Sequence, residues 1–493
     1  MRAQQVLLIT LALPLSHAAE TILGVYIFSR HGDRTAKSTP PANLTELGYE
    51  EVFTSGTYFR NRYVASNATS RIAGINSDLV RQSQITASAP LDTVLMNSAQ
   101  GFLQGLYPPV GSIRGSTPLR NGTTVQTPLN GYQLIPLQTV TSGTGSEDSA
   151  WLQGSSNCAK ALVSSNGYYT SPEYTNLLTT TADFYKSLSP LVNNTFSLND
   201  VSFKNAYTSK LFLLRPYHLL TRTDSLLPVY DLLNVASIHN STISFPPSDL
   251  YTPSSALQAR TLADTHEWNL AYNVSDSIRA ITGATLAGQV LQALNNTITG
   301  AGKSKINIQF GAYAGFQSFF GLAQLPQVNA DFYGVPDYTS TMTFELFTNG
   351  PATPFPAAAD INVRFLFHNG TTSPASEPKT YPLFGQQETT IPWNTFVDSM
   401  NKFAIGSQAQ WCQACGNSTA VCATVAKNPT SSRQADASSS GGLSTAVAGV
   451  IGAMVTLAVI LGLEALVMLV AGLRLVSKKR LAAPVEGSLG GKA

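Results

Sequence analysis

One apolar stretch, residues 21–29, constrains the fold of this chain more than any other feature. It reads Thr-Ile-Leu-Gly-Val-Tyr-Ile-Phe-Ser, which is rich in strand-forming residues and carries no charge. A short run of this kind is typical of a central strand that is covered on both faces. The polar sequence Arg30-His31-Gly32-Asp33-Arg34-Thr35 follows at once. Ligands bind beyond the carboxyl ends of strands in open α/β sheets, so we expect an α/β fold with a binding site here.

The residue types of this polar sequence suit phosphate chemistry. Arginine holds phosphate through paired hydrogen bonds, and Arg30 and Arg34 flank the histidine. A neutral imidazole such as that of His31 can attack phosphorus and carry the phosphoryl group. The alternative interpretation is a solvated turn that contains basic residues by chance. The apolar strand before it favours a functional site, with His31 as nucleophile and Arg30 and Arg34 as phosphate ligands.

Periodicity predicts several helices. We expect one over residues 44–64, capped by Thr45, and one over residues 88–106, with Pro90 near its start. Residues 110–165 are rich in Gly, Ser, Thr and Asn and are expected to be mostly loop, whereas residues 170–235 are expected to be mainly helical. Residues 262–294 are expected to form two helices separated near Gly283.

Three later segments are predicted to be strands of the same sheet as residues 21–29. Residues 306–310 form a short apolar run, and residues 342–347 and 361–367 alternate and precede Asn-Gly turns, which is typical of antiparallel strands. Strands that return after a long helical stretch predict an α/β core with a mainly helical cap. We assign the cap to an insertion at about residues 120–250 of a folded part that covers residues 20–425.

The two ends of the chain indicate the secretory pathway. Residues 1–19 combine a positive start, a short apolar run and small residues, which is typical of a signal peptide. Residues 443–473 carry a single charge and are long enough for a transmembrane helix, and a Ser/Gly-rich stalk precedes them at residues 426–442. Basic residues begin the tail, residues 474–493, so we expect a cytosolic tail and a single-pass type I membrane protein.

Sequons and cysteines agree with that compartment. The chain has nine Asn-x-Ser/Thr sequons between its ends, at Asn43, Asn67, Asn121, Asn193, Asn240, Asn273, Asn295, Asn369 and Asn417. We expect a glycosylated ectodomain, which would explain how 12% charged residues keep the surface solvated. The four cysteines, Cys158, Cys412, Cys415 and Cys422, predict two disulfides, with all three pairings open. A zinc site is disfavoured, because no nearby histidine supplies a fourth ligand.

Charge and motifs exclude several function classes. A formal net charge of +2 gives no case for nucleic-acid binding. The histidines and carboxylates show no metal-binding spacing, and the glycines form neither a Walker loop nor a dinucleotide-binding motif. We therefore expect no metal and no cofactor. Three histidines, His218, His239 and His368, are expected to be ordinary surface or core residues, and His266 is expected to pack within its helix.

The segment around His31 resembles the signature of the histidine acid phosphatases, the branch-two histidine phosphatases. That signature is Arg-His-Gly-x-Arg-x-Pro at the end of the first strand; here Ala36 replaces the proline. Residues 44–48, Leu-Thr-Glu-Leu-Gly, and residues 265–268, Thr-His-Glu-Trp, also resemble family stretches, the latter from fungal phytases. The resemblance implies a phosphoglycerate-mutase-like α/β sandwich with a helical cap, no cofactor, and an acid optimum. It also implies a third phosphate-binding arginine, for which Arg81 is the candidate, and it favours a fungal source.

One departure from the family pattern affects the chemistry. The family takes its general acid from a His-Asp pair after a late strand, where this chain has Ala312 and Tyr313. The ordinary pKa of tyrosine, near ~10, makes it a poor acid for this role at low pH. No Asp, Glu or His occurs between Lys305 and Val328, so a shifted alignment does not restore the pair. One resolution is that another carboxylate donates the proton, for which the candidates are Asp33, Asp264 and Glu267.

Two functional hypotheses follow. The first is a membrane-anchored, extracytosolic acid phosphomonoesterase that acts through a phosphohistidine, either with a relocated acid or on esters with good leaving groups. The second is a catalytically impaired family member that binds phosphorylated ligands without efficient turnover. A mutase-like activity is disfavoured, because those relatives are usually cytosolic. The sequence predicts no particular substrate beyond a phosphate monoester, and no oligomeric state.

Overall fold

The computed structural model describes residues 20–111, 116–140, 157–192, 201–206, 229–239, 251–418 and 422–423. The predicted signal peptide, stalk, transmembrane segment and tail all lie outside these ranges. Within them, no helix is both long and apolar enough to cross a bilayer.

An eight-stranded sheet organises the described residues, and β1 (Thr21–Arg30) lies at its centre. The order is β10-β8-β7-β1-β6-β2-β5, with β9 paired to β8. The other bounds are β2 (Ile85–Pro90), β5 (Leu137–Val140), β6 (Ile306–Gly311), β7 (Thr341–Thr348), β8 (Ile361–His368), β9 (Lys379–Tyr381) and β10 (Thr390–Pro392). Strands β1, β6, β2 and β5 are parallel, whereas β7 pairs antiparallel with both β1 and β8. The strands predicted at 21–29, 306–310, 342–347 and 361–367 are therefore confirmed.

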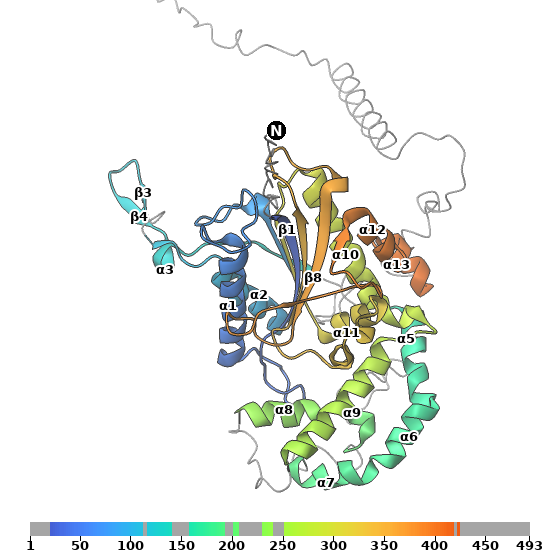
Figure 1. Cartoon of the computed structure of the whole chain (residues 1–493). Coiled ribbons are helices and arrows are strands. Elements are labelled where there is room, and N and C mark those ends of the chain that lie inside the picture. Colours follow the sequence, from blue (N-terminus) through green and yellow to red (C-terminus); the bar gives the residue numbers. More distant parts are fainter. Residues whose placement is uncertain are drawn as a thin grey trace, which may run out of the picture. The chain divides into compact units, whose positions relative to one another are not determined.

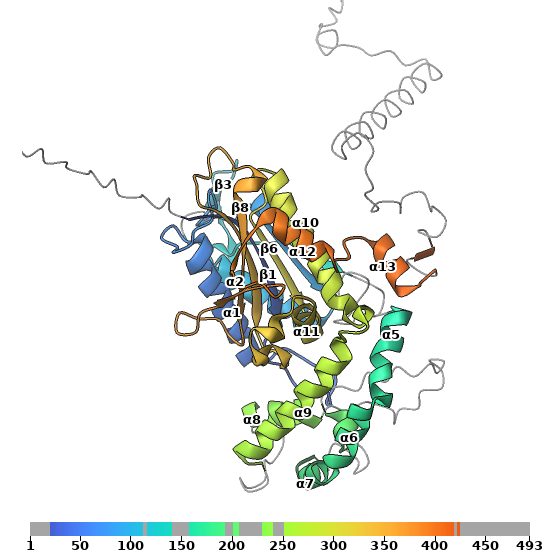
Figure 2. The same cartoon turned by 45° about the vertical axis from the view of Figure 1, so that its right-hand side comes forward.

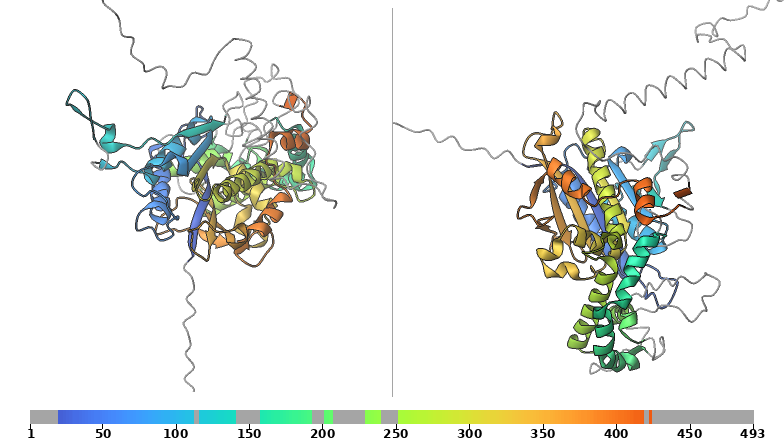
Figure 3. Two further views of the ribbon diagram at one scale, coloured as in Figure 1. Left: turned by 90° about the horizontal axis from the view of Figure 1, so that it is seen from above. Right: turned by 90° about the vertical axis from the view of Figure 1, so that its right-hand side faces the viewer.

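Helices cover both faces of the sheet (Figures 1 and 3). Val25 and Ile27 of β1 pack with α1 (Glu46–Phe59) and α2 (Thr93–Leu106) on one face. Tyr26 and Phe28 pack on the other face with α10 (Ile281–Thr299), α11 (Tyr313–Leu322) and α12 (Trp393–Asn401). The alternation of β1 side chains between two cores explains why its sequence is apolar throughout.

A helical cap with its own core extends from the sheet (Figures 1 and 2). Its helices are α5 (Ala159–Asn166), α6 (Pro172–Thr180), α7 (Ala182–Val192), α8 (Val229–His239) and α9 (Pro253–Ala271). His266 lies in this core, fully buried among Tyr168, Tyr169, Tyr174 and Phe203, which confirms that it packs within its helix. The remaining strands and α-helices of the described residues are the short hairpin β3 (Ser116–Pro118) and β4 (Thr124–Gln126), the single turn α3 (Pro128–Gly131), and α13 (Gln408–Cys415). The mixed α/β class with a helical cap is as predicted.

Two disulfides are present, and they select one of the three possible pairings. Cys158 at the start of α5 bonds to Cys415 at the end of α13, and Cys412 bonds to Cys422. The first links the cap to the C-terminal end of the described core. The four cysteines are buried together around Trp411.

Three predicted boundaries need correction. Pro90 does not open a helix; it is the last residue of β2, and α2 begins after Asp92, whose carboxylate accepts a hydrogen bond from Leu95 N at 2.9 Å. Residues 262–294 do not break at Gly283, which lies inside α10. A Cβ added to Gly283 would come within 2.5 Å of Phe319 N, so this glycine allows close packing of α10 on α11 rather than a break. The region 110–165 contains β5, a sheet strand that its loop-like composition conceals.

Candidate active site

The imidazole of His31 lies at the carboxyl end of β1, 1% exposed. Its Nδ1 lies 2.8 Å from the carbonyl oxygen of Gly32. A carbonyl only accepts hydrogen bonds, so Nδ1 is the donor in this contact. The main-chain oxygen of His31 accepts a hydrogen bond from Thr339 N at 2.9 Å, which holds the residue against the start of β7. These two contacts fix the orientation of the ring at the end of β1, as a nucleophile requires.

Two glycines set the position of the loop after β1. A Cβ added to Gly32 would lie 2.3 Å from Gly48 O, and one added to Gly48 would lie 2.1 Å from Asp33 O. The loop therefore rests directly on the first turn of α1, where Thr45 caps the helix as predicted by accepting a hydrogen bond from Gly48 N at 3.0 Å. Gly32 N also donates to Ser98 Oγ of α2 at 3.2 Å. These contacts explain why two of the family-like stretches, the one around His31 and residues 44–48, each contain a glycine.

Arg30 lies beside two aromatic rings. Its guanidinium carbon is 4.7 Å from the ring centroid of Tyr338 and 5.4 Å from that of Tyr313. Its Nη1 donates a hydrogen bond to Pro336 O. The side chain is 3% exposed and lines a small cleft of about 200 Å³. Arg30 is thus positioned to meet an anion that enters this cleft.

Arg34 is bound to a carboxylate of the cap. Its Nη2 lies 2.6 Å from Asp231 Oδ1 and its Nη1 lies 3.3 Å from Asp231 Oδ2, and both side chains are at most 2% exposed. Lys37 N donates to the same carboxylate at 2.8 Å. Burial alone would raise the pKa of Asp231, but the charge and hydrogen bonds of Arg34 outweigh it and hold that pKa below its usual value. In this arrangement Arg34 binds Asp231 through the guanidinium that the family resemblance assigns to phosphate binding.

The structure places Arg81 away from His31. Arg81 is exposed and precedes β2, at the amino ends of the parallel strands, whereas His31 follows the carboxyl end of β1. The prediction assumed that Arg81 follows the second strand, but that strand begins only at Ile85. No lysine or arginine occurs between Arg81 and Arg114, so the carboxyl end of β2 supplies no cation.

Tyr313 links the end of β6 to the cap. It begins α11, next to Ala312, and its hydroxyl donates to Glu267 Oε2 of α9 at 2.8 Å. Both side chains are buried, with Glu267 4% exposed. Tyr313 therefore lies between Arg30, which contacts its ring, and Glu267, a candidate acid that accepts a hydrogen bond from its hydroxyl.

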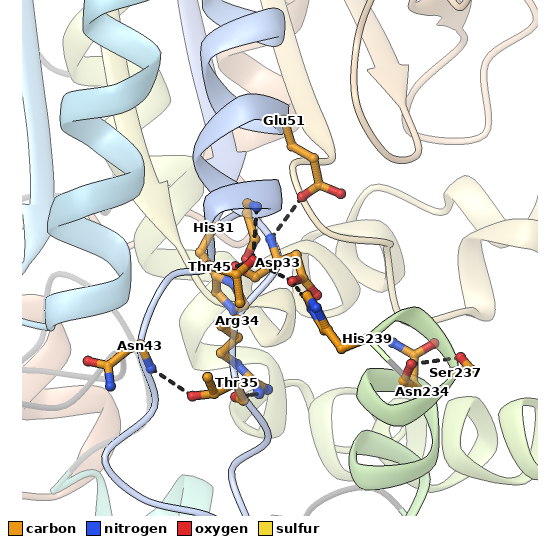
Figure 4. A network of polar contacts seen from close by, with 12 residues as sticks. His31, Asp33, Arg34, Thr35, Asn43, Thr45, Glu51, Asn234, Ser237 and His239 are labelled. Atoms are coloured by element: carbon orange, nitrogen blue, oxygen red, sulfur yellow. Dashed lines mark hydrogen bonds and ion pairs between the residues drawn. The ribbon is translucent and has the colours of Figure 1, made fainter. Parts of the chain in front are cut away.

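Asp33 is fully buried and bonded to a second residue of α8 (Figure 4). Its Oδ2 accepts hydrogen bonds from Thr45 Oγ1 at 2.6 Å and from His239 Nε2 at 2.5 Å. Its Oδ1 is buried with no hydrogen-bond partner among the described residues. Its main-chain N–H donates to Glu51 Oε2 at 2.8 Å, and burial raises the pKa of that glutamate. Sequence reasoning treated His239 as an ordinary histidine and so missed this contact.

Asp264, the third candidate acid, lines the same cleft as Arg30. Its Oδ1 accepts a hydrogen bond from Val335 N at 2.8 Å, and its Oδ2 lies 3.7 Å from Arg260 Nε. Burial raises the pKa of Asp264 to about 6, against the lowering effects of these two contacts. A carboxylic acid with such a pKa holds its proton in mildly acidic solution, which suits a general acid.

Comparisons with known proteins agree with this geometry. The model of the histidine phosphatase superfamily (branch 2) matches residues 39–368. The chain belongs to this family. Family membership supports a phosphatase-type function, and within the described residues no group of three metal-ligating side chains is found.

Several solved structures similar to this branch-two chain are phytases. That of Citrobacter braakii superposes with a TM-score of 0.50 at 13% identity, over 80% of this chain and 99% of the other, which shows a shared fold. The Hafnia alvei phytase apo form gives 0.48 at 13% identity, over 81% and 98% of the two chains. The phytase from D. castellii gives 0.43 at 13% identity, over 87% and 90%. No curated protein matches the sequence.

Proposed function

We propose that this chain is a phosphomonoesterase that acts through a phosphohistidine at His31. The placement of His31 carries the proposal, because the contact of its Nδ1 with Gly32 O orients the ring at the carboxyl end of β1, directly after Arg30. Nε2 attacks phosphorus, the bond to the ester oxygen breaks, and the departing oxygen takes a proton from the acid. Water then attacks phosphorus, the phosphorus–nitrogen bond breaks, and the carboxylate accepts the water proton, releasing inorganic phosphate.

We assign the acid to Asp264. It lines the same cleft as Arg30, and its pKa of about 6 keeps it protonated at the acid pH that the family resemblance implies. Glu267 and Asp33 are the alternatives, but each has a fixed partner, Tyr313 for the first and His239 with Thr45 for the second. Arg30 contributes positive charge to the pentacoordinate phosphoryl group.

We also propose that the enzyme acts outside the cytosol and is anchored by residues 443–473. The two disulfides support an oxidising compartment. Of the seven sequons in the described ranges, Asn43, Asn67, Asn121, Asn295 and Asn369 are exposed, so glycans can attach without unfolding.

A second candidate function is phosphate-ester binding without efficient turnover. The contact of Arg34 with Asp231 favours it, since a phosphate ligand must compete with a buried carboxylate for that guanidinium. The replacement of the family acid by Tyr313 favours it as well.

Hydrolysis of para-nitrophenyl phosphate by the purified full-length chain between about pH 3 and 8 separates the two functions. We expect acid-favoured turnover that is lost in His31→Ala and strongly reduced in Arg30→Ala. Arg81→Ala is the matched control and should leave the rate unchanged, because Arg81 lies at the opposite end of the sheet. Unchanged activity in His31→Ala would overturn the phosphohistidine mechanism. Absence of turnover, with phosphate still raising the melting temperature, would establish the binding function instead.

A further inference from the structure

A large cleft of about 1120 Å³ adjoins the small cleft at Arg30. The two share the lining residues Arg260, Asp264 and Asp337. An ester whose phosphate meets Arg30 can therefore extend its alcohol group into the larger space. Family membership alone does not say which alcohol this space accepts.

The large cleft carries an excess of negative charge. Five carboxylates line it, from Glu173, Asp264, Asp331, Asp337 and Glu377. The cations of the lining are Arg260 and Lys379, and Arg260 is already balanced by Asp337 Oδ1 at 2.9 Å and Asp264 Oδ2 at 3.7 Å. Glu173, Asp331 and Glu377 form no ion pair among the described residues, so the lining keeps a net negative charge even when Lys379 is counted.

Aromatic rings accompany this charge. Trp268 and Tyr333 meet edge to face, with ring centroids 4.7 Å apart, and Tyr333 is 48% exposed. Tyr381 lines the same cleft. Carboxylates together with aromatic faces attract an organic cation and repel an anion.

We propose that this cleft selects phosphate monoesters whose alcohol carries a positive charge, such as amino-alcohol phosphates, and rejects polyphosphorylated substrates. The proposal rests on the proposed function, because it takes the phosphate at Arg30 as the reacting group. It separates this chain from the phytases that share its fold, since additional phosphates would face Glu173, Asp331 and Glu377.

The test compares kcat/KM of the full-length chain for four esters at low ionic strength and pH 6. Phosphocholine is the cationic probe, glycerol 2-phosphate the neutral one, inositol hexakisphosphate the polyanion, and para-nitrophenyl phosphate the reference. We expect phosphocholine to exceed glycerol 2-phosphate roughly tenfold, as three partly screened carboxylates allow, and inositol hexakisphosphate to be the slowest. The preference should shrink in 0.5 M salt, where the Debye length falls to only a few ångströms.

A triple variant, Glu173→Gln, Asp331→Asn and Glu377→Gln, should abolish the preference for phosphocholine. Glu388→Gln, an exposed carboxylate outside the cleft, is the matched control and should retain it. Inositol hexakisphosphate as the best substrate, or an unchanged order in the triple variant, would overturn the inference while leaving the phosphomonoesterase function intact. If no ester is hydrolysed, the proposed function fails, and calorimetric affinities for phosphocholine and inositol hexakisphosphate decide the inference by the same criterion.

Discussion

Asp231 and Arg34 form a buried ion pair, in which each side chain neutralises the charge of the other. Removal of one member of such a pair leaves an uncompensated buried charge, which costs about 3–5 kcal/mol. We predict that Asp231→Ala lowers the free energy of unfolding by about that amount, measured by urea denaturation. Inorganic phosphate should then raise the melting temperature more in the variant than in the wild type, because phosphate replaces the missing carboxylate at Arg34. The exposed control Asp360→Ala should show neither effect.

Asp264 should make stability depend on pH in a direction opposite to that of a salt-bridged carboxylate. Its pKa rises on folding from 3.8 to about 6, so the folded protein binds the proton more tightly than the unfolded chain does. This contribution to stability is fully present below about pH 4 and is lost as pH rises through 6. We predict that the free energy of unfolding of the wild type falls by an amount on the order of 2 kcal/mol between about pH 4 and 6, and that this fall is absent in Asp264→Asn. Denaturation curves measured across pH test both expectations. A pH dependence that survives in the variant would assign it to another group.

The sequence anticipated only part of the site at this scale. Arg30, His31 and Arg34 are contiguous and follow a recognisable strand, so one motif revealed them together. Asp231, the partner of Arg34, and His239, the partner of Asp33, lie on a cap helix about two hundred positions away. Nothing in the sequence of α8 distinguishes these two from ordinary polar residues. Arg81 was assigned wrongly because the second strand begins four residues after it, not before it.

At the scale of elements, the approach of the catalytic loop to α1 depends on Gly48. An alanine Cβ at this position would lie 2.1 Å from Asp33 O and 2.7 Å from Asp33 N, both of them backbone atoms that cannot rotate away. Gly48→Ala must therefore push the loop from the helix. We predict a loss of about 1–3 kcal/mol in the free energy of unfolding. Because His31 moves with the loop, kcat should fall by a larger factor than the factor by which KM changes. Gly122→Ala is a spatial control, because no atom lies within 4 Å of its added Cβ, although its positive φ adds a small strain of its own.

Elements with a strong periodic signal were predicted well, and those defined by packing were not. The apolar run of β1 and the alternation of β7 and β8 follow from which faces are buried, and the sequence expresses this directly. Gly283 reads as a helix break, yet it serves the contact between α10 and α11. The true break lies at residues 272–276, where Asn273 Oδ1 accepts a hydrogen bond from Ser275 N at 2.9 Å. Such a side-chain turn competes with helix geometry only where tertiary contacts allow it.

At the scale of the whole molecule, the surface must stay solvated with 12% charged residues, about half the usual share. The proposed location outside the cytosol predicts that glycans on the exposed sequons at Asn43, Asn67, Asn121, Asn295 and Asn369 supply this solvation. Because these side chains are exposed, Asn→Gln substitution at all five should change the melting temperature little beyond the loss of the hydrogen bonds that join Asn369 to Asp337 and Ser340. It should nevertheless promote association of the folded protein, measured by light scattering on material from a host that glycosylates.

Mass spectrometry of the wild-type protein before and after enzymatic deglycosylation supplies the control for occupancy. The half-buried sequons Asn273 and Asn417 offer the contrast within the chain, because their substitution alters local packing rather than solvation. Asn273 forms the turn between α9 and α10, and Asn417 donates a hydrogen bond to Asn157 O beside the disulfide Cys158–Cys415. Asn→Gln at these two positions should therefore lower the melting temperature without promoting association. If the fivefold variant stays monodisperse although the wild type is shown to be glycosylated, the low charge of this surface must be compensated in some other way.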